Sequence, residues 1–296
     1  MTSDSLKAWL GNSRRDEDAV EVGAVQRLAA TLDQDPLAYR RGSELPESWY
    51  ALLFGTLAQQ HMLGPDGHPE NRHLLPPFPG TRRMFAGRRT RFHQPLHLGE
   101  AVSRLSSVTS VEAKSGRSGA FTLLTLKHEI SGTAGLAVTE EQDVVYREPV
   151  APGTADTARA FVPVAETPAW SHPFVVDPVL LFRYSALTFN AHRIHYDLDY
   201  VRSVEGYPGL VVNGGLTALL LVETARPHLP GRIAGYAARA IRPLFAGEAL
   251  AFNGRLTPDG ASLWATGPNS GLAYRVDITL EGRRESAETL REEVRS

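Results

Sequence analysis

The sequence predicts an α+β protein of two fused halves, each a curled antiparallel sheet wrapped around a central helix. The first observation is an internal repeat. Residues 87–102 and 235–250 are identical at seven of sixteen positions, among them a leading glycine, Pro-Leu and Gly-Glu-Ala. The second is that an apolar helical pattern precedes each copy and strand-like segments follow it. A repeat at an offset of 148 residues indicates a duplicated domain rather than a solenoid.

In the first half, the sequence SWYALLFGTLAQQHM predicts a helix at residues 48–62, and Ser48 can cap its start. Strands are predicted after the repeat at residues 101–113, 121–130 and 136–146. Ser115-Gly116 marks a turn between the first two, because these residue types tolerate the backbone angles and local hydrogen bonds of turns.

In the second half, a helix is predicted at residues 214–226, and it ends before Pro227 because proline cannot continue a helix. Its apolar side chains surround most of its circumference, so it must be buried on most sides. A sheet that curls around the helix provides that burial. Strands are predicted at residues 249–256, 262–266 and 272–280, and the last alternates apolar and polar residues as a half-buried strand does.

The repeat and the composition between its copies divide the chain. Residues 1–148 form the predicted first half and residues 171–296 the second. The intervening segment 149–170 is rich in Ala, Pro and Thr and is interpreted as a linker. The charged residues from Glu281 to the end are expected to be a solvated tail.

Composition excludes several function classes. The net charge of −2 and pI near 6.6 favour neither nucleic acid nor an anionic membrane as a partner. No run of about 18 apolar residues is present, and the N-terminus lacks the basic start and apolar core of a secretory signal. The chain has no cysteine, which excludes a thiol nucleophile and a disulfide framework. We therefore expect a cytoplasmic protein.

Side chains that handle protons are concentrated at residues 182–197 (FRYSALTFNAHRIHYD), shortly before an Asn-Gly-Gly step opens the second helix. A histidine can both accept and return a proton near neutral pH, and N–H groups at a helix start can polarise a carbonyl. His192 and His195 are three residues apart, but Asp197 is the only carboxylate close to them in sequence. No metal site is therefore predicted.

Residues 190–197 (NAHRIHYD), with the following YPGLVVNGG and apolar helix, resemble the MaoC-like enoyl-thioester hydratases and hydroxyacyl-thioester dehydratases. The resemblance covers most of the chain and is strongest to the double-hotdog branch, which includes mesaconyl-CoA and itaconyl-CoA hydratases and mitochondrial-type 3-hydroxyacyl-thioester dehydratases. It implies a double hotdog fold and places the family's Asp at Asn190, its Asn at His192 and its His at His195. An amide therefore replaces the carboxylate that helps to activate water, and a mechanism with two bases is put in doubt.

The resemblance and the residue chemistry imply a reversible hydration of an enoyl thioester to a 3-hydroxyacyl thioester. His195 is expected to transfer the proton, Asn190 to orient the water, and the N–H group of Gly214 to form an oxyanion hole. The alternatives are that His192 is a surface cap and that residues 213–215 are only a tight helix start. The expected substrate-binding residues are His192, Asn213, Gly215, Arg83, Arg88 and Arg89.

The three arginines of that set come from an arginine-rich stretch, TRRMFAGRRTR, at residues 81–91. Guanidinium groups suit phosphates, so they are expected to bind the phosphates of coenzyme A or of the phosphopantetheine of an acyl-carrier protein. The alternative is a solvated basic strand edge. Coenzyme A enters as part of the substrate, and no other cofactor is expected. A homodimer is predicted as the assembly.

Two other functions remain open from the sequence. The chain is alternatively a hotdog acyl-thioesterase, although that activity favours a carboxylate where Asn190 stands. It is otherwise a non-catalytic subunit that binds an acyl thioester. The acyl group itself is open between a fatty acyl chain and a short dicarboxylic acid such as mesaconate or itaconate.

Overall fold

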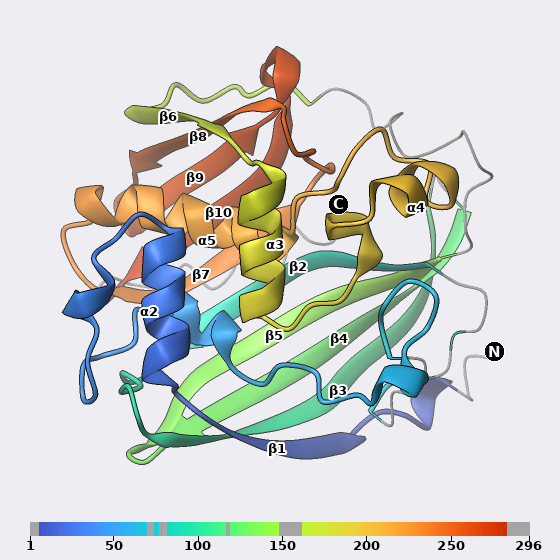
Figure 1. Cartoon of the computed structure of the whole chain (residues 1–296), viewed down its shortest axis with the longest axis horizontal. Helices are drawn as coiled ribbons and strands as arrows, with labels where there is room; N and C mark the ends of the chain where they lie inside the picture. Colours follow the sequence, from blue (N-terminus) through green and yellow to red (C-terminus); the bar gives the residue numbers. More distant parts are fainter. Residues whose placement is uncertain are drawn as a thin grey trace.

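The computed structural model describes residues 6–69, 74–76, 78, 82–116, 119–147 and 162–282, which form one ten-stranded antiparallel sheet (Figure 1). The strand order is β1-β3-β4-β5-β2-β7-β10-β9-β8-β6. Read inward from its two edges, the sheet repeats the same order, with β6 to β10 in place of β1 to β5. This is the duplicated sheet that the repeat predicts. The boundary predicted at residue 148, most of the linker and the tail from residue 283 lie outside the described residues.

The strand bounds match the predicted ones closely. Residues 249–256 and 272–280 are strands over the predicted ranges, and the first-half strands run a few residues longer than predicted. The strands are β1 (Ser13–Ala19), β2 (Arg82–Phe92), β3 (Ala101–Gly116), β4 (Gly119–Gly132), β5 (Gly135–Arg147), β6 (Trp170–Val175), β7 (Ile233–Ala240), β8 (Ala249–Leu256), β9 (Gly260–Thr266) and β10 (Leu272–Leu280).

The two halves join where β2 pairs with β7, the two strands that carry the repeat. Gly87 lies opposite Arg239, and Arg91 lies opposite Gly235. In the repeat, Gly87 corresponds to Gly235 and Arg91 corresponds to Arg239. Exchanging each residue for its equivalent turns one pair into the other, so the two copies face each other symmetrically. A Cβ atom at Gly87 would lie 2.7 Å from the Ala238 carbonyl oxygen, and one at Gly235 would lie 2.5 Å from the Thr90 oxygen. The leading glycine of each copy is therefore required by the close approach of the strands.

Helix α5 (Gly214–Ala225) is the central helix of the second half, and eight of its twelve residues are buried. It packs against β8, β9 and β10, as Figure 1 shows. Helices α2 (Val22–Thr31) and α3 (Pro178–Leu187) follow the equivalent strands β1 and β6 and pack against each other. A short helix, α4 (Leu198–Ser203), follows the histidines, and the Asp197 carboxylate caps it by accepting from the Tyr200 N–H at 3.0 Å.

The helix predicted at residues 48–62 is wrong. That segment forms a short 3₁₀ turn at Glu47–Leu52, extended chain, and a second turn at Gln60–Met62. Phe54 adopts a positive φ of 60° and its N–H donates to the Asp18 carboxylate, so tertiary contacts end the helix that local propensity favours. The remaining 3₁₀ turns are Pro36–Ala38, Arg193–His195, Arg226–His228 and Pro268–Ser270.

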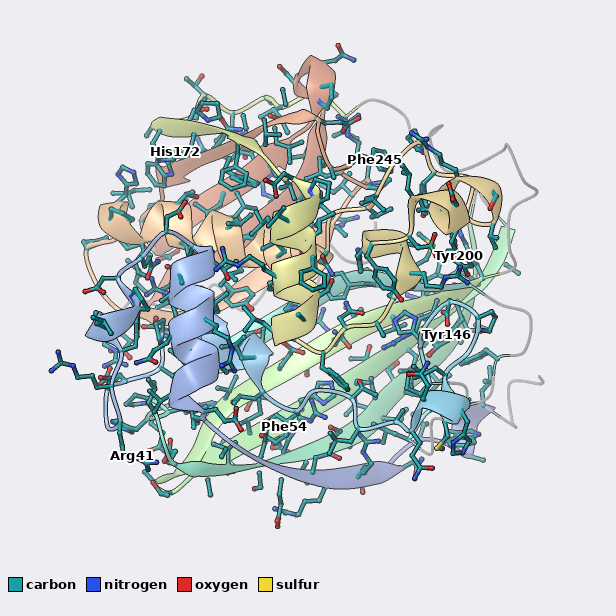
Figure 2. All side chains as sticks on the ribbon, in the orientation of Figure 1. Arg41, Phe54, Tyr146, His172, Tyr200 and Phe245 are labelled. Carbon is teal, nitrogen blue, oxygen red and sulfur yellow. The ribbon has the colours of Figure 1, made fainter. Side chains whose placement is uncertain are left out.

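Most buried side chains belong to one core, which contains the apolar face of α5 and spans both halves. A separate small cluster lies on the first-half sheet, where Leu74 and Leu75 pack against Val108, Leu124 and Val144. Figure 2 shows side chains from both halves filling the space between sheet and helices. Among the described residues, no helix has the length and apolar character needed to cross a membrane.

The join between the halves can be tested with a single methyl group. We expect Gly235→Ala to lower the free energy of unfolding by about 1–3 kcal/mol, because the new Cβ must displace the Thr90 carbonyl. Gly231→Ala is the matched control, since no heavy atom lies within 4 Å of a Cβ there. Thermal and urea unfolding measure both. Equal stability of the two variants would contradict the role of the glycine.

Candidate active site

A cavity of about 2570 Å³ lies where the two halves meet, and side chains of both halves line it. Eight of the nine predicted site residues are among its lining residues, and only Arg89 is not. Tyr146 of the first half and Tyr200 of the second, both labelled in Figure 2, also line it. The fold therefore brings together residues that the sequence places more than a hundred positions apart.

The cavity owes its size to the difference between the halves. In the second half α5 covers β8, β9 and β10. The equivalent segment of the first half makes only 3₁₀ turns, and the cavity extends over β2, β3, β4 and β5 instead. A hydrophobic sheet face is normally covered by another layer. In the first half, part of the covering layer is missing, and the cavity occupies its place.

His195 is held at the end of a short turn and buried, with 7% of its surface exposed. Its Nδ1 lies 2.7 Å from the Val211 carbonyl oxygen. A carbonyl can only accept, so Nδ1 carries the hydrogen, and in the neutral ring the lone pair is on Nε2. Before this turn, the Asn190 side-chain oxygen accepts from the His192 N–H at 3.1 Å, which fixes the backbone that leads into it. This is the arrangement of a general base.

Burial also keeps His195 uncharged. It lowers the pKa of His195 to about 4, and the nearby charge of His68 acts in the same direction, while the hydrogen bond to Val211 opposes them in part. Burial likewise lowers the pKa of His192, together with the charges of His68 and His195. The rings of His192 and His195 meet edge to face with centroids 5.5 Å apart. At neutral pH both imidazoles are therefore neutral.

The N-terminus of α5 opens on the same cavity. Gly214 and Gly215 start the helix after Asn213, and no hydrogen bond from their N–H groups to other described residues is present. The first N–H groups of a helix have no partner inside it and carry its positive dipole end. A Cβ at Gly215 would lie 2.7 Å from the Tyr184 hydroxyl oxygen, so a larger residue there would have to displace the Tyr184 side chain. These groups can polarise a carbonyl oxygen placed between them.

Buried polar atoms without a partner also line the cavity. Both amide atoms of Asn213 and the hydroxyls of Ser185 and Tyr274 have no hydrogen-bond partner among the described residues. Such atoms are costly when buried unless something satisfies them. A polar ligand in the cavity would supply the missing partners.

Arg88 places a positively charged guanidinium group at the wall of the cavity. Its side chain is 12% exposed and pairs with Glu140 at 3.3 Å, while the Tyr50 hydroxyl donates to the same carboxylate. Burial opposes the charge of Arg88, but Glu140 and the neighbouring tyrosine hydroxyls together outweigh it, so the pKa of Arg88 is raised. A Cβ at Gly215 would lie 3.9 Å from Arg88 Nη2, so the guanidinium lies near the start of α5. Arg88 is thus part of the interior of the site rather than a solvated basic edge.

The other arginines of that stretch take different places. Arg83 lines the cavity. Arg89 forms ion pairs with Asp143 at 2.6 Å and with Glu141 at 3.0 Å. Arg239 and Arg242 of the second half line the cavity as well.

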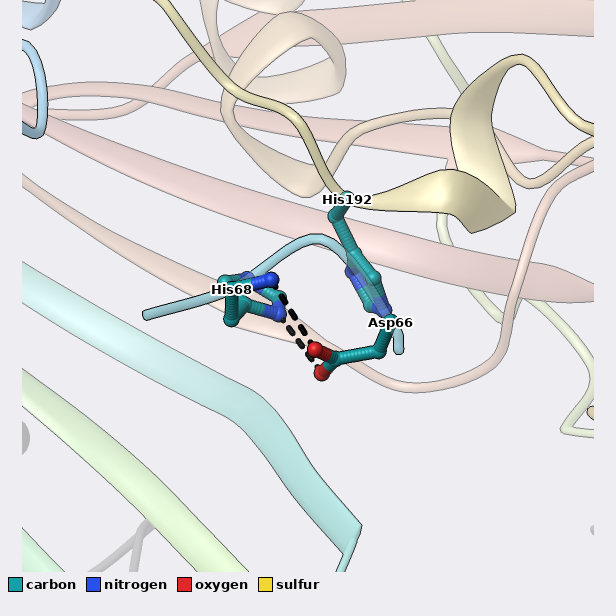
Figure 3. A group of neighbouring side chains, drawn as sticks. All are labelled: Asp66, His68 and His192. Atoms are coloured by element: carbon teal, nitrogen blue, oxygen red, sulfur yellow. Dashed lines mark hydrogen bonds and ion pairs between the residues drawn. The ribbon is translucent and has the colours of Figure 1, made fainter. Parts of the chain in front are cut away.

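Sequence reasoning missed Asp66 and His68, which come from the first half and lie beside the motif. The His68 Nδ1 is 2.9 Å from an Asp66 oxygen, and the His68 and His192 ring centroids are 4.2 Å apart (Figure 3). The sequence LGPDGHP at 63–69 shows a turn with two ionisable groups, but only the tertiary fold places it against residues 190–195.

Asp66, His68 and His192 are also the one group of described residues whose ligand atoms, all within 4.8 Å of one another, suit a metal ion. The Asp66 oxygen and the His68 Nδ1 face each other as a hydrogen-bonded pair, rather than facing a common centre. The arrangement therefore fits a carboxylate–imidazole pair better than a metal site, and the absence of a metal stays a prediction.

The protonation state of His195 is directly measurable. In ¹⁵N-resolved NMR spectra we expect one neutral imidazole with hydrogen on Nδ1 at pH 7, which titrates near pH 4 instead of 6.5 because burial disfavours the charged ring. The spectrum of His195→Gln assigns the signal. Titration of this ring near pH 6.5, or hydrogen on Nε2, would contradict the proposed general base.

Comparison with known proteins gives a consistent match. The family model for hydroxyacyl-thioester dehydratase type 2 matches residues 49–246. The mesaconyl-C4-CoA hydratase of Chloroflexus aurantiacus is 42% identical over 95% of this chain and all of its own length. The mitochondrial hydroxyacyl-thioester dehydratase type 2 of Schizosaccharomyces pombe is 27% identical over 70% of this chain and 77% of its own.

Solved structures show the same fold at low sequence identity. A MaoC-like dehydratase from Phytophthora capsici superposes with a TM-score of 0.69, at 13% identity, over 95% of this chain and all of that one. A protein from Mycobacterium tuberculosis described as a double hotdog fold gives a TM-score of 0.53 at 16% identity, over 91% of this chain and 96% of that one. The sheet and its central helix therefore form a double hotdog.

Proposed function

Because the chain belongs to the MaoC-like hydroxyacyl-thioester dehydratase type 2 family, and is thus an enzyme of the hydro-lyase class, we propose that it reversibly hydrates a short enoyl-CoA at this cavity. The single observation that carries the proposal is the convergence on one cavity of a neutral histidine with a basic Nε2 and a helix N-terminus with available N–H groups. Hydration of an enoyl thioester needs both at once.

The proposed reaction begins with the thioester carbonyl oxygen at the N–H groups of Gly214 and Gly215. As water adds to the β-carbon, the π electrons move toward the carbonyl and negative charge develops on its oxygen, where the helix N-terminus stabilises it. His195 Nε2 takes a proton from the attacking water, and Asn190, whose amide can donate but cannot ionise, helps to orient that water. The α-carbon then takes a proton, and dehydration is the reverse.

The proposed acyl group is short and carries a second carboxylate. A relative that is 42% identical over its whole length is described as a mesaconyl-C4-CoA hydratase. The cavity fits such an acid because Arg88 Nε and the Tyr274 hydroxyl are buried without hydrogen-bond partners among the described residues. Both residues lie near the start of α5, where a Cβ at Gly214 would be 3.6 Å from the Tyr274 ring. A carboxylate on the acyl group can accept from both.

The coenzyme A part of the substrate is proposed to extend along the arginines that line the cavity. The cavity volume of about 2570 Å³ exceeds the ~300–1,000 Å³ of ordinary small-molecule sites, as a substrate with a long carrier requires. Arg83, Arg239 and Arg242 are the lining cations that suit the phosphates of coenzyme A. A homodimer in the cytoplasm remains a prediction.

Hydratase activity should depend on His195. We expect His195→Ala to lower kcat for mesaconyl-C4-CoA by roughly 10²–10⁴-fold, because no other group takes the water proton. Loss of the conjugated enoyl-thioester absorbance measures hydration, and a thiol reagent measures hydrolysis in the same sample. His93→Ala is the control, since His93 is exposed and its Nε2 lies 2.9 Å from the Thr139 hydroxyl, away from the motif. Release of free thiol, or full activity of His195→Ala, would contradict the proposal.

The proposed preference for an acyl group with a free carboxylate can be tested by replacing Arg88. We expect Arg88→Met to lower kcat/KM for mesaconyl-C4-CoA more than for crotonyl-CoA, which lacks the second carboxylate, because only the first substrate loses a charged partner. Steady-state kinetics with both thioesters measure the ratio. An equal loss for the two substrates would mean that Arg88 has a structural role only, through Glu140.

A further inference from the structure

A loop of the first half is locked onto the motif of the second. The Arg193 N–H donates to the Asp66 carbonyl at 2.9 Å, and the Arg193 guanidinium donates to the Pro65 carbonyl at 2.9 Å. Gly67 has a φ of +88°, and a Cβ on it would lie 1.9 Å from the Ala191 oxygen. Only glycine allows this approach. The loop at 64–68 is therefore held at a defined position beside the candidate active site.

The loop presents a carboxylate–imidazole pair. One Asp66 oxygen accepts from the His68 N–H and the other accepts from His68 Nδ1, both at 2.9 Å. The ring is thereby fixed in orientation, and Nε2 is the nitrogen that gains and loses a proton. The His68 side chain is 25% exposed and lines the cavity together with Asn190 and His195. Figure 3 shows the pair beside His192, whose ring centroid lies 4.2 Å from that of His68 and 5.5 Å from that of His195.

We propose that His68, oriented by Asp66, is the second acid–base group of this enzyme and delivers the proton to the α-carbon. The inference rests on the proposed hydratase function and deepens it. It assigns catalysis to both halves of the chain, whereas the sequence alone assigns it to the second. The resemblance places the family's carboxylate at Asn190, whose amide cannot transfer a proton, and we assign that part to His68.

The step is balanced in atoms and electrons. The water oxygen bonds to the β-carbon, and its O–H electrons stay on oxygen as His195 Nε2 takes the proton. The π pair of the Cα–Cβ bond, held as an enolate, then forms the Cα–H bond with the proton of His68 Nε2. His195 ends protonated and His68 neutral, and water in the cavity carries the proton from one ring to the other before the next turnover. No oxidant or metal ion is required.

The charges around His68 support this division of roles. Burial raises the pKa of Asp66, but its hydrogen bonds with His68 outweigh that effect and lower it, so Asp66 is ionised and stabilises an imidazolium beside it. The charge on His68 in turn lowers the pKa of His192 and His195. Arg83 acts in the same direction on His192. An imidazole paired with an ionised carboxylate and a second, buried imidazole on the same cavity are suited to serve as acid and base.

The test uses the full-length enzyme, mesaconyl-C4-CoA, and kinetics from pH 5 to 10. We expect His68→Gln to lower kcat by roughly 10²–10⁴-fold with KM changed by no more than a few-fold, because the group acts on proton transfer and not on binding. In the wild type kcat falls at alkaline pH as the acid loses its proton, and this limb should disappear in the variant. Asp66→Asn should give a smaller loss.

Two controls separate chemistry from structure. His68→Asn retains a donor toward Asp66 but cannot transfer a proton, so it should be as slow as His68→Gln while unfolding at the wild-type temperature. His172→Gln alters an exposed histidine on β6 and should leave kcat unchanged.

The inference is overturned if His68→Gln and His68→Asn keep kcat within about twofold of the wild type while His195→Ala is inactive. In that case the proposed function stands and the role of His68 fails. It is also overturned if EDTA abolishes activity and Zn²⁺ or Mn²⁺ restores it, since the cluster then holds a metal. If the wild type does not hydrate the thioester at all, the proposed function fails and this inference fails with it.

Discussion

The antiparallel pairing of β2 with β7 is the contact on which the rest of the structure depends. It joins two five-stranded sheets into one, and it requires a glycine at the same repeat position on each side, Gly87 and Gly235. The cavity lies over this join, so its walls come from both halves. The strand that makes the join also carries Arg88, which places a paired cation near the N-terminus of α5. A constraint on backbone packing thus determines where chemistry can occur.

The two halves differ in what covers their sheets. Helix α5 fills the second sheet, whereas Glu47–Leu52 makes only a short turn in the first. Burying a helix against a sheet is a major source of stability in such folds, so its loss has a cost. The remaining turn is anchored instead by Trp49, whose indole N–H donates to Glu223 of α5 at 3.0 Å. The space left open is where the proposed thioester would reach the turn that holds His195.

The sequence alone predicts most of the sheet and the second-half helix, because strand alternation and an all-round apolar helix are local patterns. It fails at 48–62, where the bond of Phe54 to Asp18 and a positive φ override helical propensity. It identifies His195 as a candidate base from the motif. It does not find His68, because that residue reaches the site only through tertiary contacts such as the Arg193–Asp66 hydrogen bond. Local chemistry is readable from sequence, while convergence of distant segments is not.

The central claim is that one thioester binds between the helix N-terminus and the histidines at the join of the two halves. A crystal structure of the His195→Ala variant with mesaconyl-C4-CoA tests this most directly. The account predicts the thioester carbonyl oxygen within hydrogen-bond distance of the Gly214 or Gly215 N–H. It also predicts the α-carbon on the side of His68 and the acyl carboxylate at Arg88. An acyl group bound outside this cavity, or a carbonyl turned away from α5, would contradict it.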